Sequence, residues 1–395
     1  MKVALLTSGG IAPCLSSSVG RLAEKYYAKY PDVEIIGYLN GYKGLLLGKS
    51  ILINKECDFS RLYKLGGTPI GNSRVKLTNH EDCVSNGYID KDEEALEVAA
   101  KQLVADKVDI LHTIGGDDTN TTAGDLVDYL DKNNYQLTVV GLPKTIDNDV
   151  YPISLTLGAI TAAQQSALFF ENIVNENTTS SRQLIIHEVM GRNCGWLTAK
   201  SAQIYIKKLN DKVFLPEINI TKDKWNIHAV YIPEVRIDIS KEILRLSKIM
   251  DEFDCVNIFL SEGAGIDSII DDMKSQNMEI PTDAFGHIRL DEINPGKWFA
   301  KKLKDELKAD KVLVQKSGYF SRSSPSSEKD LEIIFQTVDI AIESAINNKS
   351  GVVGFDEEHD NKLKCINFNR IKGGKPFDAE SDWFLEIMNK IGQIN

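Results

Sequence analysis

Short apolar runs alternate with longer amphipathic segments along almost the whole chain. Each apolar run is bounded by Gly, Pro, Asn or Asp, and a short apolar run between such residues is typical of a buried strand. We therefore predict strands at residues 3–6, 34–39, 108–114, 137–142, 183–189 and 256–260.

The segments between these runs have helical patterns of apolar and polar residues. The predicted helices are residues 93–105, 119–131, 155–175, 240–254, 295–307 and 331–347. Strand–helix alternation of this kind is typical of an α/β fold, in which largely parallel sheets are flanked by helices. Two polar segments, residues 211–226 and 321–327, are interpreted as loops or lobe crossings, the second of them a flexible connection.

The chain has 395 residues, which is long for one domain, so we expect two lobes. The two predicted lobes are residues 1–155 with about 321–360, and residues 156–320 with a C-terminal helix at 376–395.

Composition and charge restrict the class of partner. The net charge of -11 disfavours nucleic acid and anionic membranes, and a phosphate substrate would need positive contacts gathered locally. The six cysteines form no Cys-x-x-Cys pair, which favours free thiols in a reducing compartment. The N-terminus lacks the apolar stretch of a signal peptide, and no segment approaches the roughly 18 apolar residues of a transmembrane helix. The expected location is the cytoplasm.

In parallel α/β sheets ligands bind where strands end, so candidate chemistry is expected directly after each apolar run. The first such position is Gly9-Gly10. Paired glycines let backbone N–H groups approach an anion, and a helix starting at about Pro13 would direct its positive end to the same place. The alternative is a tight strand-to-helix turn without a ligand.

The second position is Gly115-Gly116-Asp117-Asp118-Thr119, which follows a predicted strand and opens a helix. Asp117 offers a hard oxygen ligand suited to magnesium that bridges phosphates. Asp117 or Asp118 could instead be an ordinary helix cap. Two carboxylates beside exposed amides destabilise the fold unless cations occupy the site, so a functional role is favoured.

The third position is residues 142–149, again after a predicted strand. Pro143 stiffens the start of this loop. Lys144 and Asp147 suit a cation and a general base that move a phosphoryl group onto an alcohol. A purely structural turn is the alternative, because Asn and Asp are frequent in turns. The acidic residues of the second and third positions would lie at one edge of one sheet, and this convergence favours chemistry.

Three further segments carry side chains that could bind a phosphate or a sugar. In Met190-Gly191-Arg192 the guanidinium of Arg192 can grip a phosphate with its planar fork. Glu262 could hold sugar hydroxyls, although alone it would be interpreted as part of a turn. Tyr319 and Arg322 supply a hydroxyl and a cation suited to a sugar phosphate.

Taken together, the segments 115–119, 143–149 and 190–192 resemble the motifs of the phosphofructokinase family. The resemblance runs from residue 3 to about residue 350, and the block Thr-Ile-Asp-Asn-Asp is very specific. Other segments that fall in the family's order are Gly9-Gly10, Gly67-Thr68 with Arg74, Ser261-Glu262-Gly263, and residues 319–322.

The resemblance implies magnesium-dependent transfer of a phosphoryl group to fructose 6-phosphate. Asp147 would take the proton from the 1-hydroxyl, Asp117 would hold Mg²⁺, and Gly9, Gly10 and Arg74 would contact the phosphoryl donor. The residues implied to bind the sugar phosphate are Thr145, Ile146, Asp147, Met190, Gly191, Arg192, Glu262, Tyr319, Phe320, Ser321 and Arg322. The donor and magnesium would bind in the first lobe, and the sugar phosphate mainly in the second.

Two positions bear on the identity of the donor. Family members that use ATP carry Gly where this chain has Asp118 and Lys144. A carboxylate at Asp118 would repel the α-phosphate of ATP, and Lys144 would supply a positive charge to the leaving phosphate. Both differences match the pyrophosphate-dependent branch, so the expected reaction is the reversible, glycolytic conversion of fructose 6-phosphate and pyrophosphate to fructose 1,6-bisphosphate and phosphate.

Alternatives stay open beside this interpretation. An ATP-dependent phosphofructokinase would keep the fold and change the donor, and a non-catalytic sugar-phosphate-binding paralogue would keep the fold alone. Sedoheptulose 7-phosphate is a further candidate acceptor, since the residues that grip it would be similar.

The chain departs from the family's pattern at two places. Pro13 is followed by Cys14, where Pro-Gly and then Asn are usual. Many relatives hold the 6-phosphate with two arginines from a neighbouring subunit, and this chain has Gln183 and Leu313 there. Arg182 and Lys316 lie nearby and are candidates to replace them. The family is usually oligomeric, and we expect a homo-oligomer, as a first guess a dimer.

Overall fold

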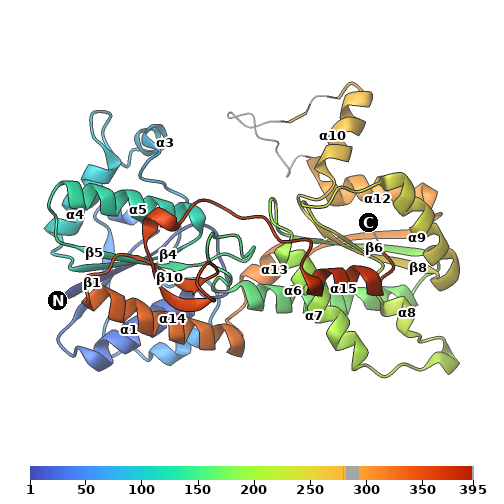
Figure 1. The fold of residues 1–395 in the computed structure, drawn as a ribbon, viewed down its shortest axis with the longest axis horizontal. Helices are drawn as coiled ribbons and strands as arrows, with labels where there is room; N and C mark the ends of the chain where they lie inside the picture. Colours follow the sequence, from blue (N-terminus) through green and yellow to red (C-terminus); the bar gives the residue numbers. More distant parts are fainter. Residues whose placement is uncertain (279, 282–292, 394–395) are drawn as a thin grey trace. The chain divides into compact units, whose positions relative to one another are not determined.

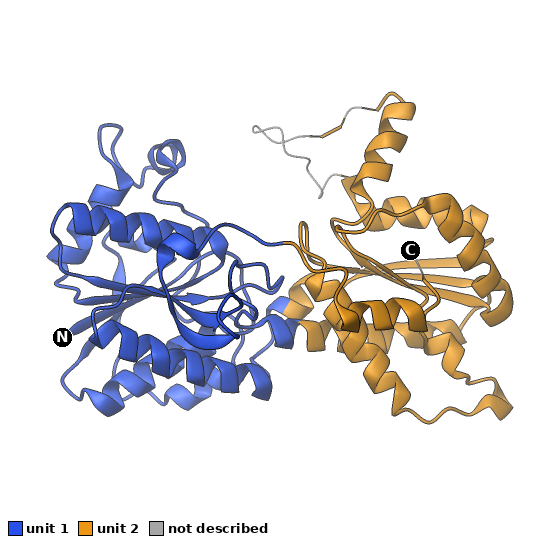
Figure 2. Ribbon diagram, viewed as in Figure 1, with its two compact units in different colours: residues 1–162, 322–375 blue, residues 163–321, 376–395 orange. Residues whose placement is uncertain are grey.

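The chain divides into two units, each with its own sheet (Figure 2). Unit 1 comprises Met1–Ala162 and Arg322–Lys375, and unit 2 comprises Ala163–Ser321 and Pro376–Asn395. The structure is a computed structural model that describes residues 1–278, 280–281 and 293–393.

Unit 1 is built on a seven-stranded sheet. Its strands are β1 (Lys2–Thr7), β2 (Glu34–Tyr38), β3 (Ser50–Leu52), β4 (Ile110–Gly115), β5 (Thr138–Pro143), β10 (Gly351–Asp356) and β11 (Lys362–Ile366). They lie in the order β11-β10-β5-β4-β1-β2-β3. The five central strands are parallel, whereas β11 and β3 run antiparallel at the two edges. The parallel strands β1, β4 and β5 therefore end at the same edge of the sheet.

Helices cover both faces of this sheet. In Figure 1, α4 and α5 lie on one face, and α1 and α14 lie on the other. The helical elements of unit 1 are α1 (Leu15–Lys29), α2 (Tyr42–Leu46), η1 (Phe59–Lys64), α3 (His80–Ser85), α4 (Ala95–Ala105), α5 (Asp117–Lys132), α14 (Glu328–Ile346) and η4 (Phe368–Arg370). A further helix, α6 (Ala159–Ile173), begins in unit 1 and continues in unit 2.

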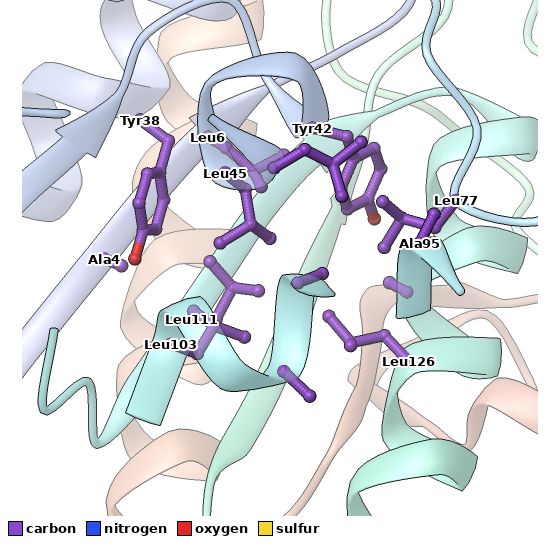
Figure 3. Packing of buried hydrophobic residues seen from close by; sticks show 14 of the residues in the cluster. Ala4, Leu6, Tyr38, Tyr42, Leu45, Leu77, Ala95, Leu103, Leu111 and Leu126 are labelled. Atoms are coloured by element: carbon purple, nitrogen blue, oxygen red, sulfur yellow. The ribbon is translucent and has the colours of Figure 1, made fainter. Parts of the chain in front are cut away.

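The core beneath α4 and α5 forms because side chains along a strand point alternately to the two faces of the sheet. Leu6 of β1 and Leu111 of β4 point to the same face, where Leu103 of α4 and Leu126 of α5 pack on them (Figure 3). All four side chains are buried, and burial of one leucine side chain is worth about 1.5–3 kcal/mol. This packing fixes the strand ends from which the loops of the candidate site emerge.

Unit 2 has a four-stranded, fully parallel sheet. Its strands, in the order β7-β8-β6-β9, are β7 (Ala229–Tyr231), β8 (Cys255–Ser261), β6 (Gln183–Val189) and β9 (Lys311–Lys316). The helical elements are η2 (Val174–Thr178), α7 (Trp196–Asn210), η3 (Pro216–Ile218), α8 (Lys222–Trp225), α9 (Ile239–Phe253), α10 (Ile266–Ser275), α12 (Pro295–Glu306), α13 (Gly318–Arg322) and α15 (Asp382–Lys390). In Figure 1, α9 and α12 cover one face, and α6, α7 and α8 cover the other.

The predicted α/β fold with largely parallel, helix-flanked sheets is confirmed. The six strands and the six helices predicted between them are present, with ends that differ by at most four residues. Of the C-terminal helix predicted at 376–395, α15 covers Asp382–Lys390, and residues 394–395 lie outside the described residues. The prediction that residues 321–327 form a loop or a lobe crossing is confirmed, because the boundary between the units falls at Ser321 and Arg322 and residues 323–327 have no regular secondary structure. The segment is held by a bond of Ser326 Oγ to Ser17 Oγ (2.8 Å) and by the side chain of Ser327, which caps α14. The loop predicted at residues 211–226 contains two short helical elements, η3 and α8. Within the part of the chain that is described, helices are too short or too polar to cross a membrane.

Candidate active site

The loop after β1 is held by its neighbours in unit 1. Gly9 has a positive φ of 84°, and its N–H donates to the carbonyl oxygen of Ser73 (2.8 Å). The Gly9 amide is therefore used by the fold, and it ties this loop to the segment that carries Arg74. The helix expected from about Pro13 begins two residues later, at Leu15.

Lys144 lies beneath the glycine loop. Its side chain is only 3% exposed, and its Nζ donates a hydrogen bond to the carbonyl oxygen of Gly10 (2.6 Å). Burial lowers the pKa of Lys144 to about 8, and the positive charges of Arg322 and Arg74 act in the same direction. Cys14 and Asp149 act in the opposite direction. The ammonium is thus desolvated with two like charges nearby, an arrangement that an incoming polyanion would stabilise.

Arg322 lies at the same loop. Its Nε donates to the carbonyl oxygen of Ile11 (2.9 Å), and a Cβ on Gly10 would collide with its guanidinium. Sequence reasoning grouped Arg322 with the sugar-phosphate residues, whereas the structure brings it to Gly10 and Lys144 in unit 1. Its predicted companions belong to unit 2, where Tyr319 is 76% exposed, Phe320 is also exposed and Ser321 is buried.

Two carboxylates open α5, directly after β4. Asp117 is half-buried, and its Oδ1 accepts no hydrogen bond from any described residue. Burial raises the pKa of Asp117, and the negative charges of Asp118 and Asp149 raise it further. Acidic residues in the first turn of a helix are stabilised by the helix dipole, so the two carboxylates also benefit the stability of α5.

Asp118 differs from its neighbour because it is exposed and paired. Its Oδ1 lies 2.7 Å from Nζ of Lys76. Lys76 was not identified from the sequence. The only local signal for it was its position two residues after Arg74, a predicted donor contact. The pair is exposed on both sides, so it contributes little to stability, and it places a positive charge beside the carboxylate of Asp118.

The loop after β5 is braced by Asn148, which sequence reasoning did not single out. Asn148 has a positive φ of 56°, its Oδ1 accepts from the Thr156 N–H (2.8 Å), and its Nδ2 donates to the carbonyl oxygen of Ser154 (2.9 Å). Thr145 Oγ1 accepts from the Asp147 N–H (3.2 Å). These bonds fix the turn on which half-buried Asp147 and buried Ile146 lie. The register pairs Gly115 with Pro143, so the two acidic loops leave adjacent strands side by side.

The remaining predicted sugar-phosphate residues belong to unit 2. Gly191 has a positive φ of 127°, and its carbonyl oxygen accepts from Ser261 Oγ (2.6 Å). The carbonyl oxygen of Arg192 packs on Gly263 so closely that a Cβ there would overlap it. Burial raises the pKa of Glu262, while a hydrogen bond from the Gly191 N–H opposes this shift. The structure therefore brings the 190–192 loop and the end of β8 together, with the Arg192 side chain exposed.

The candidates to replace the cross-subunit arginines are engaged within unit 2. Arg182 donates to the carbonyl oxygens of Leu307 (2.7 Å) and Lys308 (2.8 Å) just after α12, and to Asp251. Lys316 forms an ion pair with the buried carboxylate of Glu188 (2.6 Å). Arg182 thus stabilises the fold of its own unit and is a poor candidate for reaching a neighbouring subunit.

Known proteins resemble this chain over almost its whole length. The family model described as "Phosphofructokinase" matches residues 2–331. Proteins named pyrophosphate--fructose 6-phosphate 1-phosphotransferase from Methylomonas methanica and Methylotuvimicrobium alcaliphilum are 54% and 53% identical over 394 residues, covering 99% of this chain and 96% of each relative. A solved pyrophosphate-dependent phosphofructokinase from Marinobacter aquaeolei matches with a TM-score of 0.72 at 19% identity, covering 99% of this chain and 91% of the other. The structural match supports the shared fold, and the sequence matches span the segments in which the candidate site residues lie.

Proposed function

The chain belongs to the phosphofructokinase family, and on this premise we propose its reaction and the roles of its residues. It is a pyrophosphate-dependent phosphotransferase that phosphorylates fructose 6-phosphate at the 1-hydroxyl, a reversible step of glycolysis that forms fructose 1,6-bisphosphate and phosphate. The observation that carries the donor assignment is buried Lys144, whose ammonium lies at the Gly10 carbonyl beside Arg322 and within electrostatic range of Arg74.

We assign Lys144, Arg74 and the Gly9-Gly10 loop to pyrophosphate, with unit 1 as the donor unit. A small polyanion without a nucleoside gains its affinity from charge, and desolvated cations interact with it more strongly than exposed ones. Asp118, which pairs with Lys76, would lie where a nucleotide places its α-phosphate and would repel it. The two residues together would favour the inorganic donor.

Magnesium fits the acidic end of α5. The Asp117 Oδ1 is buried without a hydrogen-bond donor among the described residues, and a hard cation would satisfy it. Asp117 would hold the ion, with Asp118 and Asp149 adding negative charge nearby. When bound, Mg²⁺ would neutralise phosphate charge and bridge its oxygens.

Asp147 is our candidate for the general base. It would accept the proton of the sugar 1-hydroxyl as that oxygen bonds to phosphorus and the bridging P–O bond of pyrophosphate breaks. Lys144 would offset the charge that grows on the leaving phosphate. The hydrogen bonds of Asn148 hold the turn of Asp147 in place before the substrate arrives.

The sugar phosphate is assigned mainly to unit 2. Arg192 would grip a phosphate, and Glu262 would accept hydrogen bonds from sugar hydroxyls. Arg322 contacts the Gly9-Gly10 loop, which we assign to pyrophosphate. If Arg322 also binds the sugar phosphate, it would contact both substrates. The other proposed sugar contacts are Thr145, Ile146, Asp147, Met190, Gly191, Tyr319, Phe320 and Ser321.

The donor is tested by a coupled assay that supplies pyrophosphate or ATP separately with fructose 6-phosphate and Mg²⁺. Turnover is expected with pyrophosphate, and the double variant Asp118→Gly with Lys144→Gly should shift the preference towards ATP. Turnover of the native chain with ATP alone, or sugar-phosphate binding in calorimetry without turnover by either donor, would overturn the assignment. Sedoheptulose 7-phosphate serves as an alternative acceptor in the same assay.

We propose further that the enzyme is a cytoplasmic homo-oligomer, with a dimer as the first expectation. All six cysteines are free, as expected of proteins in a reducing compartment. Light scattering on a sizing column tests the assembly, and a dimer would have twice the 44.0 kDa mass of one chain.

A further inference from the structure

Glu234 joins three segments of unit 2 just after the edge strand β7. Its Oε1 accepts hydrogen bonds from the backbone N–H of Gly195 (2.9 Å) and of Phe377 (2.8 Å), and its Oε2 lies 3.1 Å from the Gly195 nitrogen. One carboxylate therefore connects the end of β7, the start of α7 and the C-terminal segment.

The bond to Gly195 satisfies a backbone donor at the start of α7. Gly195 is the N-cap residue of this helix, and its own N–H has no acceptor within the helix. The carboxylate of Glu234 accepts from this N–H, as a glutamate at N3 does in a capping box, and places negative charge at the positive end of the helix dipole. The backbone of Gly195 packs directly on the side chain of Ile232, so closely that a Cβ on Gly195 would lie 2.5 Å from the Cβ of Ile232. The backbone of Gly195 is thus seated on the end of β7.

Gly195 is also the last residue of the loop that carries Arg192. The other side of this loop is held by the end of β8, where Ser261 Oγ donates to the Gly191 carbonyl (2.6 Å) and Gly263 packs on the Arg192 carbonyl. The loop therefore has two supports, β8 for Gly191 and Arg192, and Glu234 for Gly195. Loss of either support would let the backbone that presents Arg192 shift.

The second partner of Glu234 belongs to the C-terminal segment of unit 2. The ring of Phe377 packs on Trp383 (5.2 Å) and Phe384 (5.3 Å), and Nζ of Lys200 on α7 lies 5.1 Å from the centre of the Trp383 ring. Near the chain end, the amide of Gln393 makes two hydrogen bonds with the backbone of Val230 in β7. The segment is therefore fastened to β7 and α7, and Glu234 joins it to the loop.

We propose that Glu234 is a positioning residue for the sugar-phosphate loop, and that through it the C-terminal segment contributes to affinity for fructose 6-phosphate. The proposal rests on the function proposed above, since it takes the 190–192 loop as a sugar-phosphate contact. Glu234 acts through Gly195 and touches neither substrate. Its removal should therefore weaken the binding of one substrate and leave the other unchanged.

The test compares Glu234→Ala with Glu234→Gln. Alanine removes the hydrogen bonds to both N–H groups and the charge. The expected result is a KM for fructose 6-phosphate about tenfold higher, which corresponds to the loss of a charge-assisted bond at about 1.4 kcal/mol per tenfold. Glutamine keeps an oxygen that can accept from both N–H groups, so its KM should rise about threefold or less. The KM for pyrophosphate should stay within about twofold in both variants. The matched control is Glu217→Ala, at an exposed glutamate of η3, and it should change neither constant.

The outcomes separate positioning from general destabilisation. An unchanged KM for fructose 6-phosphate in the alanine variant, or an equal rise in both KM values, overturns the proposal. If the alanine variant does not fold, the glutamine variant decides by the same split between the two KM values, and no split overturns the proposal. A native chain without pyrophosphate-dependent turnover would instead defeat the proposed function. Calorimetry with fructose 6-phosphate would then decide, since equal affinity of native chain and variants would still overturn the positioning role.

Discussion

The titration of Lys144 gives the sharpest test of the donor site. Only the charged ammonium can offset the negative charge of pyrophosphate, and burial lowers the pKa of this lysine to about 8. Raising the pH from 7 to 9 should therefore remove the charge from most free enzyme molecules. We expect kcat/KM for pyrophosphate to fall over this range.

The size of the fall follows from the titration of a single group. With a pKa of about 8, about nine tenths of the molecules carry the charge at pH 7 and about one tenth at pH 9, so kcat/KM should drop about tenfold. In Lys144→Met the charge is absent at every pH. The variant should lose roughly 10²–10³-fold in kcat at neutral pH, the usual cost of removing one donor to a developing charge.

The assay is the ratio of native to Lys144→Met kcat/KM for pyrophosphate at each pH. Substrate and magnesium ionisation affect both proteins equally and cancel in this ratio. The internal control is kcat/KM for fructose 6-phosphate at saturating pyrophosphate, which should decline less because bound donor keeps the lysine charged. A ratio that stays constant from pH 7 to 9 would refute a role for the Lys144 charge in donor binding.

Two further predictions concern the base and the core. Asp147→Ser should lower kcat by about 10²–10⁴-fold with little change in fructose 6-phosphate affinity, and near-normal turnover in a coupled assay would remove Asp147 from the base role. In unit 2, burial among aromatic rings lowers the pKa of His187 to about 3, below its ordinary value of 6.5. The unfolded chain therefore takes up a proton first as pH falls below 6.5, and the native state should lose about 2 kcal/mol of stability from this residue by pH 5. Urea unfolding of the native chain and of His187→Phe at pH 7 and 5 checks this, and an equal loss in both proteins would contradict it.

The central strands could be predicted because parallel strands are buried on both faces and form continuous apolar runs. β9 was missed because Lys311–Lys316 begins and ends with lysine and is only partly buried. β10 and β11 form an antiparallel pair at the edge of unit 1, where the pattern is weaker. For α1 only a start at about Pro13 was predicted. Its first turn contains serines that are buried because they contact remote segments, as Ser17 contacts Ser326, and the sequence pattern does not reveal such contacts.

In the candidate site, too, features set by neighbouring residues in the sequence could be predicted, and contacts between remote segments could not. Each motif follows the strand that presents it, so the positions of Asp117, Lys144 and Asp147 at the ends of adjacent strands could be predicted from the sequence alone. Pairs of side chains from remote segments could not be identified, because spacing along the chain does not reveal which side chains meet. Lys76 with Asp118 is one such pair, and the support of Gly195 by Glu234, 39 positions further on, is another.

The surroundings of Lys144 explain how an acidic protein can attract a polyanion. The net charge of -11 is distributed over the whole chain, and exposed charges are screened beyond about 8 Å at physiological ionic strength. Arg322, 311 positions from the Ile11 carbonyl that it contacts, lies with Lys144 at one loop, and Arg74 is within electrostatic range. At such short range, and with Lys144 shielded from water, these cations act on a donor more strongly than carboxylates on the distant surface do. Tertiary folding therefore assembles the positive site from distant parts of the chain, and the overall charge does not predict it.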